Sequence, residues 1–248
     1  MDFFQRFPLT IEEKMLIITG TGRCGTATLA RILGGHHEFR VGYILDKYFL
    51  GADPSSNPFD TIEKRLAVIL DLHQGIDRRT FVDSSNLSIH FIDALYILDT
   101  SVKFVLSVRN GRDFVRSALS RRWHEQNIFG TAPLRDDPYY DRWTSLTPIQ
   151  KNAWIWVSRN RRALEGLRNV PVVQKLTVRI EDIRKEGTLD MLATFAGMPV
   201  RERELAEKGC NANPSFDLPP KDEWTRDMNE EFYEIAGEMM RYFGYDED

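Results

Sequence analysis

Glycine, arginine and hydroxyl side chains gather in one short stretch, residues 15 to 33, which reads MLIITGTGRCGTATLARIL. An apolar run precedes its glycine loop (residues 20–25), and a helical pattern follows the loop directly. Backbone N–H groups and the positive end of a helix dipole converge at such a junction, which favours an anion. Arg23 is the nearest cation. These residues indicate phosphate or sulfate chemistry; the alternative is a tight turn whose glycines serve only the backbone.

The spacing of residues in the glycine loop can be compared with the sequence patterns of two kinds of nucleotide site. A dinucleotide site needs the pattern G-x-G-x-x-G, which the loop supplies, and an acidic residue about 20 positions further on, where Asp46 stands. An NAD(P)-dependent oxidoreductase is therefore one hypothesis. A nucleoside triphosphate site needs a Lys-Ser/Thr pair directly after Gly25, but Thr26 and Ala27 occupy those positions. The sequence therefore argues against a kinase or an ATPase.

A second anion-binding pattern lies in KFVLSVRNGRDFVRSALSRRW. An apolar strand ends at Arg109, a turn follows, and Ser117 stands on the next predicted helix. At 3.6 residues per turn, about two turns of that helix bring Ser117 round to the crevice at the end of the strand. Arginine suits phosphate because its planar fork matches the oxygens and stays charged. The helix also carries four further arginines, which we expect to form a solvated basic face: Arg112, Arg116, Arg121 and Arg122.

Together the two patterns resemble the 5′-phosphosulfate loop and the 3′-phosphate motif of sulfotransferases that use 3′-phosphoadenosine 5′-phosphosulfate. The resemblance implies a metal-free enzyme that transfers a sulfuryl group to a hydroxyl, or to an amine, and releases adenosine 3′,5′-bisphosphate. It implies that Arg109 and Ser117 hold the 3′-phosphate, and that Cys24 takes a place usually held by Ser or Thr. The loop residues assigned to the donor are Gly22, Arg23, Cys24, Gly25, Thr26, Ala27 and Thr28.

The catalytic assignments also come from the resemblance. The segment RRTFVDSSNLSIHFIDAL resembles a family segment in which a strand ends in an acid, which implies Asp83 as the general base. Arg23 is implied as the cation that stabilises the leaving phosphate. Ser84 stands where the family usually has lysine, so two alternatives stay open. One is that Asp83 or Ser84 only caps the following helix; the other is that the protein is a nucleotide-binding relative without catalytic activity.

Near the carboxyl end, DEWTRDMNEEFYEIAGEMMRYFGY resembles the closing segment of the same family. The match implies that Trp224 and Arg226 approach the adenosine end of the donor. The alternative is that Trp224 packs a loop onto the core. RIEDI at 179–183 resembles a strand-end motif of the family.

Elements that could position these residues alternate along the chain. Apolar runs of strand length occur at residues 15–19, 39–44, 80–82, 102–108 and 172–180. Helical spacing occurs at residues 26–33, 62–72, 88–98, 112–122, 148–167, 189–196 and about 229–243. The alternation predicts an α/β fold with a central parallel β-sheet flanked by helices, and the resemblance implies a three-layer sandwich. Residues 1–248 are interpreted as one domain, with a substrate-facing insertion at 124–147.

Composition limits the function classes. The chain has 248 residues, 42% hydrophobic and 28% charged, which is ordinary globular usage, and a net charge of -4 argues against a nucleic-acid partner. The two cysteines favour a reducing compartment, and no run approaches the roughly 18 apolar residues of a membrane span, so a cytoplasmic location is expected. The histidines show no metal-ligand spacing. The expected partner is a small-molecule, carbohydrate or lipid acceptor with a hydroxyl group; the oligomeric state is left open.

Overall fold

A parallel four-stranded sheet forms the centre of the computed structural model, which describes residues 14–33, 47–48, 53–72, 80–126, 128–200 and 218–245. Its strands are β1 (Lys14–Gly20), β2 (Thr80–Asp83), β3 (Lys103–Val108) and β4 (Lys175–Arg179), in the order β2-β1-β3-β4. Every neighbouring pair is parallel. The predicted α/β fold with a parallel sheet is confirmed, whereas the strand expected at 39–44 lies outside the described residues.

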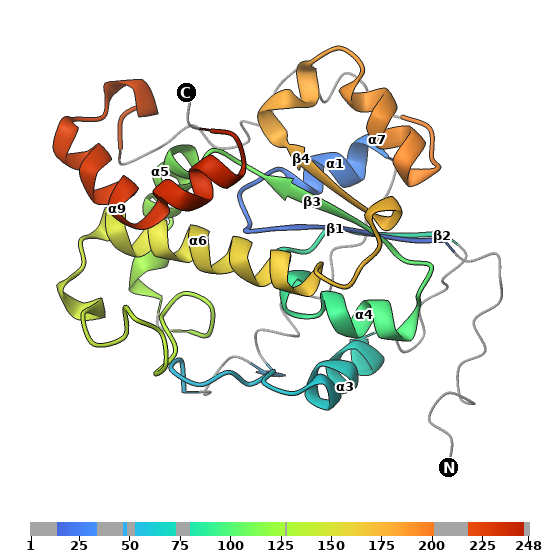
Figure 1. Cartoon of the computed structure of the whole chain (residues 1–248), viewed down its shortest axis with the longest axis horizontal. Helices are drawn as coiled ribbons and strands as arrows, with labels where there is room; N and C mark the ends of the chain where they lie inside the picture. Colours follow the sequence, from blue (N-terminus) through green and yellow to red (C-terminus); the bar gives the residue numbers. More distant parts are fainter. Residues whose placement is uncertain are drawn as a thin grey trace.

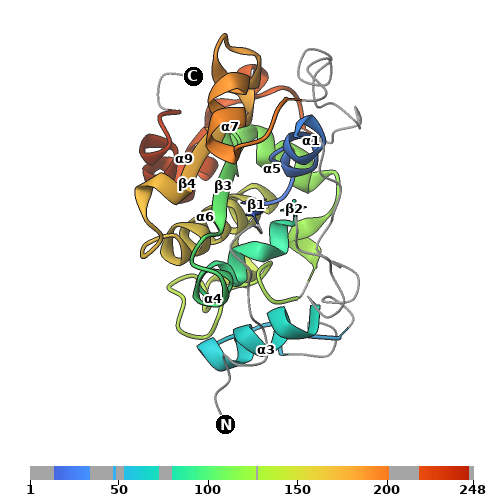
Figure 2. The same ribbon diagram turned by 90° about the vertical axis from the view of Figure 1, so that its right-hand side faces the viewer.

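The helices form a layer on each side of the sheet, as Figures 1 and 2 show. On one side lie α1 (Thr26–Ile32) and α7 (Thr188–Ala196). On the other side lie α4 (Ile92–Leu98) and α6 (Pro148–Gly166), with α3 (Ile62–Leu72) packed outside α4. The remaining described α-helices are α5 (Gly111–Leu119) and α9 (Arg226–Tyr242). None of the described helices is long and apolar enough to cross a bilayer.

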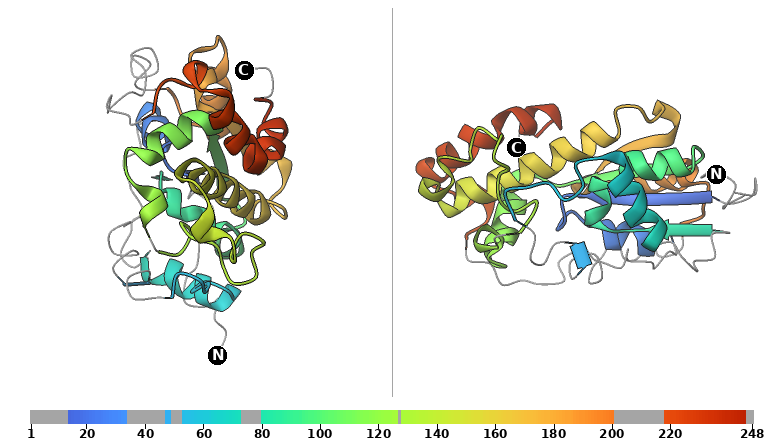
Figure 3. Two further views of the ribbon diagram at one scale, coloured as in Figure 1. Left: turned by 90° about the vertical axis from the view of Figure 1, so that its left-hand side faces the viewer. Right: turned by 90° about the horizontal axis from the view of Figure 1, so that it is seen from below.

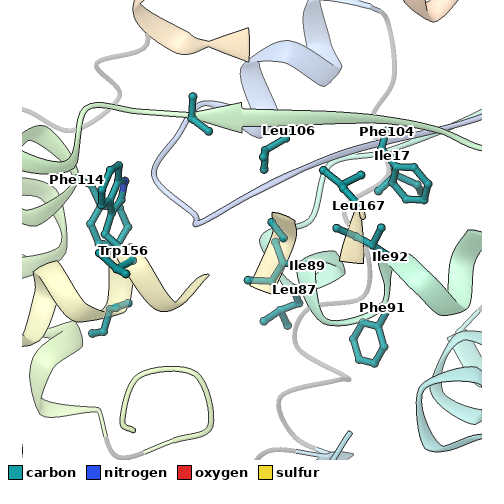
Figure 4. Packing of buried hydrophobic residues seen from close by; sticks show 14 of the residues in the cluster. Ile17, Leu87, Ile89, Phe91, Ile92, Phe104, Leu106, Phe114, Trp156 and Leu167 are labelled. Atoms are coloured by element: carbon teal, nitrogen blue, oxygen red, sulfur yellow. The ribbon is translucent and has the colours of Figure 1, made fainter. Parts of the chain in front are cut away.

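Alternation along the strands explains the two helical layers. Leu16 and Ile18 of β1 belong to the core beneath α1 and α7, whereas Ile17, between them, belongs to the core on the α6 side. Successive side chains of a strand point to opposite faces, so a continuously apolar strand requires cover on both. Figure 4 shows Ile17 and Phe104 on the α6 side, close to Leu167 and Ile92.

Two predicted boundaries differ from the structure. The strand expected at 172–180 begins only at Lys175, because Val172 and Val173 form a 3-10 turn in which their side chains are 80% and 79% exposed. The helix expected at 88–98 is split into a 3-10 helix, η3 (Asn86–His90), and α4. A run of apolar residues alone does not distinguish an exposed turn from the end of a strand, which explains why the start of this strand was placed too early.

Helix α6 is the long central helix of the layer opposite α1. It begins where the sequence predicted, because Thr147 and Gln150 form a capping box and Pro148 stands in the first turn. Its buried face carries Trp156, which is fully buried. Helix α9 lies beside α6, as both views of Figure 3 show. The segment expected as an insertion, of which 124–126 and 128–147 are described, contains turns and 3-10 helices but no α-helix.

The end of α9 is tied to the carboxyl ends of two strands. The hydroxyl of Tyr245 donates to Glu181 Oε2 (2.9 Å), and Glu181 Oε1 accepts from the backbone N–H of Asn110 (2.9 Å). Arg179 donates to the carbonyl of Gly244 at 2.8 Å. Burial, followed by the negative charge of Glu181, raises the pKa of Tyr245, so its hydroxyl keeps the proton that it donates. The network fixes the backbone beside Arg109.

Replacing Tyr245 with Phe tests this attachment. We expect Tyr245→Phe to lower the free energy of unfolding by about 1 kcal/mol, because it removes one hydrogen bond whose acceptor, Glu181, is itself exposed. Tyr242→Phe is the matched control, because the Tyr242 ring is 66% exposed and the change should stay within about 0.5 kcal/mol. Urea denaturation followed by tryptophan fluorescence measures both; equal effects would contradict the network.

Candidate functional site

The glycine loop connects β1 to α1 in a left-handed backbone conformation. Gly22, Arg23 and Gly25 have φ values of 84°, 56° and 81°. A left-handed conformation costs a non-glycine residue roughly 1–2 kcal/mol, so Arg23 is held there by its surroundings. At Gly25 an added Cβ would lie 2.5 Å from Ile180 Cδ1, so the Ile180 side chain would have to shift, and the positive φ would strain any other residue. The glycines therefore serve close packing as well as turn geometry.

Arg23 joins the two motifs that the sequence predicted separately. Its Nε donates to Ser117 Oγ at 3.1 Å, and Arg109 Nη1 donates to the carbonyl oxygen of Arg23 at 3.1 Å. Ser117 is 1% exposed on α5, whose first residues follow β3 directly. Sheet order explains the meeting: β1 and β3 are neighbours, so the loop after one strand lies beside the helix after the other. The structure brings Arg23, Arg109 and Ser117 together.

The charges around Arg23 are of one sign. Partial burial lowers the pKa of Arg23, and the positive charges of Arg121 and Arg109 lower it further. Within the part of the chain that the structure describes, none of these three guanidinium groups lies within ion-pair distance of a carboxylate. A cluster of arginines without acidic partners attracts an anion. The local geometry therefore fits a phosphate-bearing ligand.

The prediction of a solvated basic face on α5 is partly wrong. Arg112 is 7% exposed, donates to Asn229 Oδ1 and lies over the ring of Tyr233. Arg116 donates from Nε to the carbonyl of Leu218 at 2.9 Å. Arg112 therefore attaches α5 to α9, and Arg116 attaches α5 to the segment that leads into α9, rather than forming a solvated surface. The sequence pattern missed this because α9 and its approach lie more than a hundred residues further along the chain.

Cys24 faces the protein interior. Its side chain is fully buried, and its carbonyl oxygen accepts a hydrogen bond from Ser107 Oγ at 2.5 Å. Burial raises the pKa of the thiol, which favours the neutral form. The other donor-site positions of the loop differ in exposure: Thr26 is 9% exposed, Thr28 is half-buried and Ala27 is exposed. The contribution of position 24 to a ligand would come from the backbone, so a missing Ser or Thr hydroxyl removes little.

Arg159 is a residue that sequence reasoning missed. It lies on α6 at 7% exposure, and its Nη1 donates to the carbonyl of Thr21 at 2.9 Å. Its Nε donates to the carbonyl of Gly130 in the insertion at 3.2 Å. Burial lowers the pKa of Arg159 to about 10, so the group stays charged at neutral pH. The available signal was an arginine on the buried stripe of α6, between Trp156 and Ala163.

Trp123 completes the surroundings of the loop. The guanidinium of Arg159 lies 4.7 Å from the centroid of its ring, a cation–π distance. An added Cβ on Gly22 would lie 2.9 Å from Trp123 Cη2. Glycine at position 22 therefore lets the indole pack against the loop backbone.

Asp83 lies at the carboxyl end of β2 and is fully buried. Its Oδ1 accepts from the backbone N–H of Ser85 at 3.1 Å. The cap of η3 is Ser85, whose Oγ accepts from Leu87 N at 3.1 Å. The interpretation that Asp83 or Ser84 caps this helix is therefore wrong: Asp83 forms the turn before the cap. The Asp83 carboxylate therefore lies at the end of the strand but is not exposed to solvent.

Trp224 and Arg226 lie apart from the arginine cluster. Trp224 is 7% exposed, donates from Nε1 to the carbonyl of Pro219 at 3.2 Å and packs edge-on against Phe232. Arg226 is exposed and forms an ion pair with Glu230 at 2.6 Å. Trp224 thus packs a loop onto the core. Among the described residues, no contact joins either side chain to Arg23, Arg109 or Ser117.

Two further expectations concern other ligands. Asp46, on which the dinucleotide hypothesis depends, lies outside the described residues. Within the described ranges, no group of three or more His, Cys, Asp and Glu side chains is placed to hold a metal ion.

Comparison with known proteins adds the fold family. The sequence significantly matches neither a protein-family model nor a curated protein. The structure resembles the sulfotransferase domain from the curacin biosynthetic pathway (TM-score 0.54, 15% identity, 92% of this chain and 97% of that chain covered). It also resembles the sulfotransferase domain of the Synechococcus PCC 7002 olefin synthase (TM-score 0.53, 17% identity, 98% of each chain covered). A third similar structure is a sulfotransferase from Alicyclobacillus acidocaldarius (TM-score 0.51, 15% identity, 93% of this chain and 96% of that chain covered). The chain therefore has the sulfotransferase fold.

Proposed function

We propose that the protein transfers a sulfuryl group from 3′-phosphoadenosine 5′-phosphosulfate to a hydroxyl group of a small acceptor. The observation that carries the proposal is the direct contact of Arg23 with Ser117 and Arg109 at the strand ends. Solved structures of the same fold are named sulfotransferases, which supports the reaction class. A nicotinamide-dependent oxidoreductase would leave Arg109 and Ser117 without a role.

The arginine cluster suits a donor that carries phosphate at two positions. Arg109 and Ser117 would hold the 3′-phosphate, and Arg23 with the loop amides would hold the 5′-phosphosulfate. When bound, the donor supplies the sulfuryl group and a phosphate leaving group. Arg23 stays protonated at working pH, so it stabilises the negative charge that develops on the leaving oxygen. It cannot serve as a proton donor for the same reason.

The acceptor hydroxyl must lose a proton as its oxygen bonds to sulfur and the bond from sulfur to the bridging oxygen breaks. We propose that Asp83 accepts this proton. Asp83 ends β2, which pairs with β1, the strand that leads into the glycine loop. The assignment rests on the resemblance and on this location.

Arg109→Ala tests the donor site. We expect the affinity for adenosine 3′,5′-bisphosphate to fall about 10- to 100-fold, because a hydrogen bond to a charged group is worth about 1.5–3 kcal/mol. Arg226→Ala is the matched control: this arginine was also assigned to the donor, but it pairs with Glu230 and should change affinity little. Calorimetry measures both variants, and circular dichroism checks the fold. Unchanged affinity in Arg109→Ala would sink the donor-site assignment.

Asp83→Asn tests the base. Asparagine retains an oxygen that can accept from Ser85 N–H but cannot take up the proton, so turnover should fall by about 10²–10⁴ while nucleotide affinity stays the same. Asp99→Asn is the control, because Asp99 is also buried and accepts from Ser101 N–H at 2.8 Å. The readout is release of adenosine 3′,5′-bisphosphate with a panel of hydroxyl acceptors. Normal turnover in Asp83→Asn would place the base elsewhere.

A further inference from the structure

A cavity of about 290 Å³ lies between η3, α6 and the insertion. His90 of η3, Phe129 and Gly130 of the insertion, and Arg159 of α6 are among its lining residues. Arg159 also donates to the carbonyl of Thr21 in the loop between β1 and α1. One side chain therefore belongs to the wall of the cavity and contacts the backbone that leads into the glycine loop. Through Arg159, the cavity wall is therefore bonded to Thr21, which directly precedes Gly22 of the glycine loop.

The lining of the cavity carries charges of both signs in equal number: Arg159, Arg161, Arg162, Asp136, Asp137 and Glu165. Two of these are used within the protein. Arg159 holds the carbonyls of Thr21 and Gly130, and Asp137 accepts from Tyr139 N and from Trp154 Nε1. The four others have no hydrogen bond or ion pair to their charged groups among the residues that the structure describes. Both donors and acceptors thus remain available to a ligand.

This pattern selects a ligand chemistry. An apolar acceptor would remove charged groups from water without replacing their hydrogen bonds, which is costly. A strongly anionic or cationic acceptor would lose its hydration without a net attraction from the wall, because the wall carries as many positive as negative charges. A hydroxyl group both donates and accepts, so it can pair with guanidinium and with carboxylate groups alike. Burial, with the positive charges of Arg162 and Arg159, holds the pKa of His90 well below its ordinary value, so the imidazole adds no charge.

The remaining lining suits the apolar faces of a sugar ring. Phe129, Leu134 and Trp154 contribute carbon surface beside the charged groups. The volume lies near the lower end of the roughly 300–1,000 Å³ typical of ligand pockets, so it fits a small molecule rather than a long chain. Aromatic walls with a few polar groups that fix orientation are the usual composition of such sites.

We infer that this cavity binds the acceptor and that the acceptor is a neutral, polyhydroxylated molecule of the sugar class, held between Arg162 and Glu165. The inference rests on the proposed function, because it makes the cavity's ligand the hydroxyl that receives the sulfuryl group. In that reaction a sugar oxygen gains the bond to sulfur and gives its proton to the base, the role proposed above for Asp83, while the donor's bridging oxygen keeps the electron pair of the bond that breaks.

Binding of small probes to the full chain tests the inference. The probes are N-acetylglucosamine, maltose, glucuronate and p-nitrophenol, measured by saturation-transfer NMR and titration. We expect a neutral sugar to bind at least tenfold more tightly than glucuronate or p-nitrophenol. Tighter binding of either of these two, or no binding of a neutral sugar at millimolar concentration, would overturn the inference.

Substitutions in the cavity wall test whether the sugar binds there. Arg162→Gln and Glu165→Gln should each weaken sugar binding by roughly tenfold, because each removes a charged hydrogen-bond partner and keeps the side-chain length similar. Arg168→Gln and Glu186→Gln are the matched controls, since both residues are exposed and lie outside the cavity lining. Equal effects in the controls would contradict the site.

Nucleotide binding separates this inference from the function on which it rests. Adenosine 3′,5′-bisphosphate should bind with the same affinity to the wild type and to all four variants. If the nucleotide binds and no neutral sugar does, the sugar inference fails and the donor site stands. If neutral sugars bind and the nucleotide does not, the proposed sulfuryl transfer fails and the sugar site stands.

Discussion

The parallel direction of all four strands is the constraint on which the rest of the structure depends. Parallel strands end at the same edge of a sheet, and in open α/β folds ligands bind beyond that edge. The glycine loop follows β1, Asp83 ends β2, Arg109 follows β3, and Glu181 follows β4. Residues that follow β1, β3 and β4 thus come into contact without any local sequence signal for it. Because β1 and β3 are neighbours, Arg23 reaches Ser117 directly.

Like charges at that edge carry a cost for the ligand-free protein. Partial burial and then the positive charges of Arg121 and Arg109 lower the pKa of Arg23, and the left-handed backbone of Arg23 adds strain. An anion with several charged oxygens would relieve the repulsion. The same region is supported from behind by the bond of Glu181 to the backbone of Asn110. A strained site that is held by stable surrounding structure is common where binding requires a preorganised geometry.

The sequence predicted the elements well where periodicity is local, and less well where distant segments decide. The parallel sheet, α1, α3 and α6 follow from apolar spacing and caps, and the structure brings the predicted glycine loop into contact with Arg109 and Ser117. The burial of Cys24 could not be predicted, because its side-chain direction depends on the left-handed turn before it. Arg159 was hidden in a helix whose partners, Thr21 and Gly130, come from two separate loops. Arg112 was misread for the same reason.

The two carbonyl contacts of Arg159 have a thermodynamic consequence. Thr21 belongs to the connection that leads into the glycine loop, and Gly130 belongs to the insertion, yet one buried guanidinium holds both. A ligand that displaces either carbonyl changes the hydrogen bonding of the other. Linkage requires that, if one ligand changes the affinity of the second by some factor, the second changes the affinity of the first by the same factor. Arg159 thereby joins the backbones of the two loops through one side chain, so any difference in its contacts between ligand-bound and ligand-free states would couple the two loops.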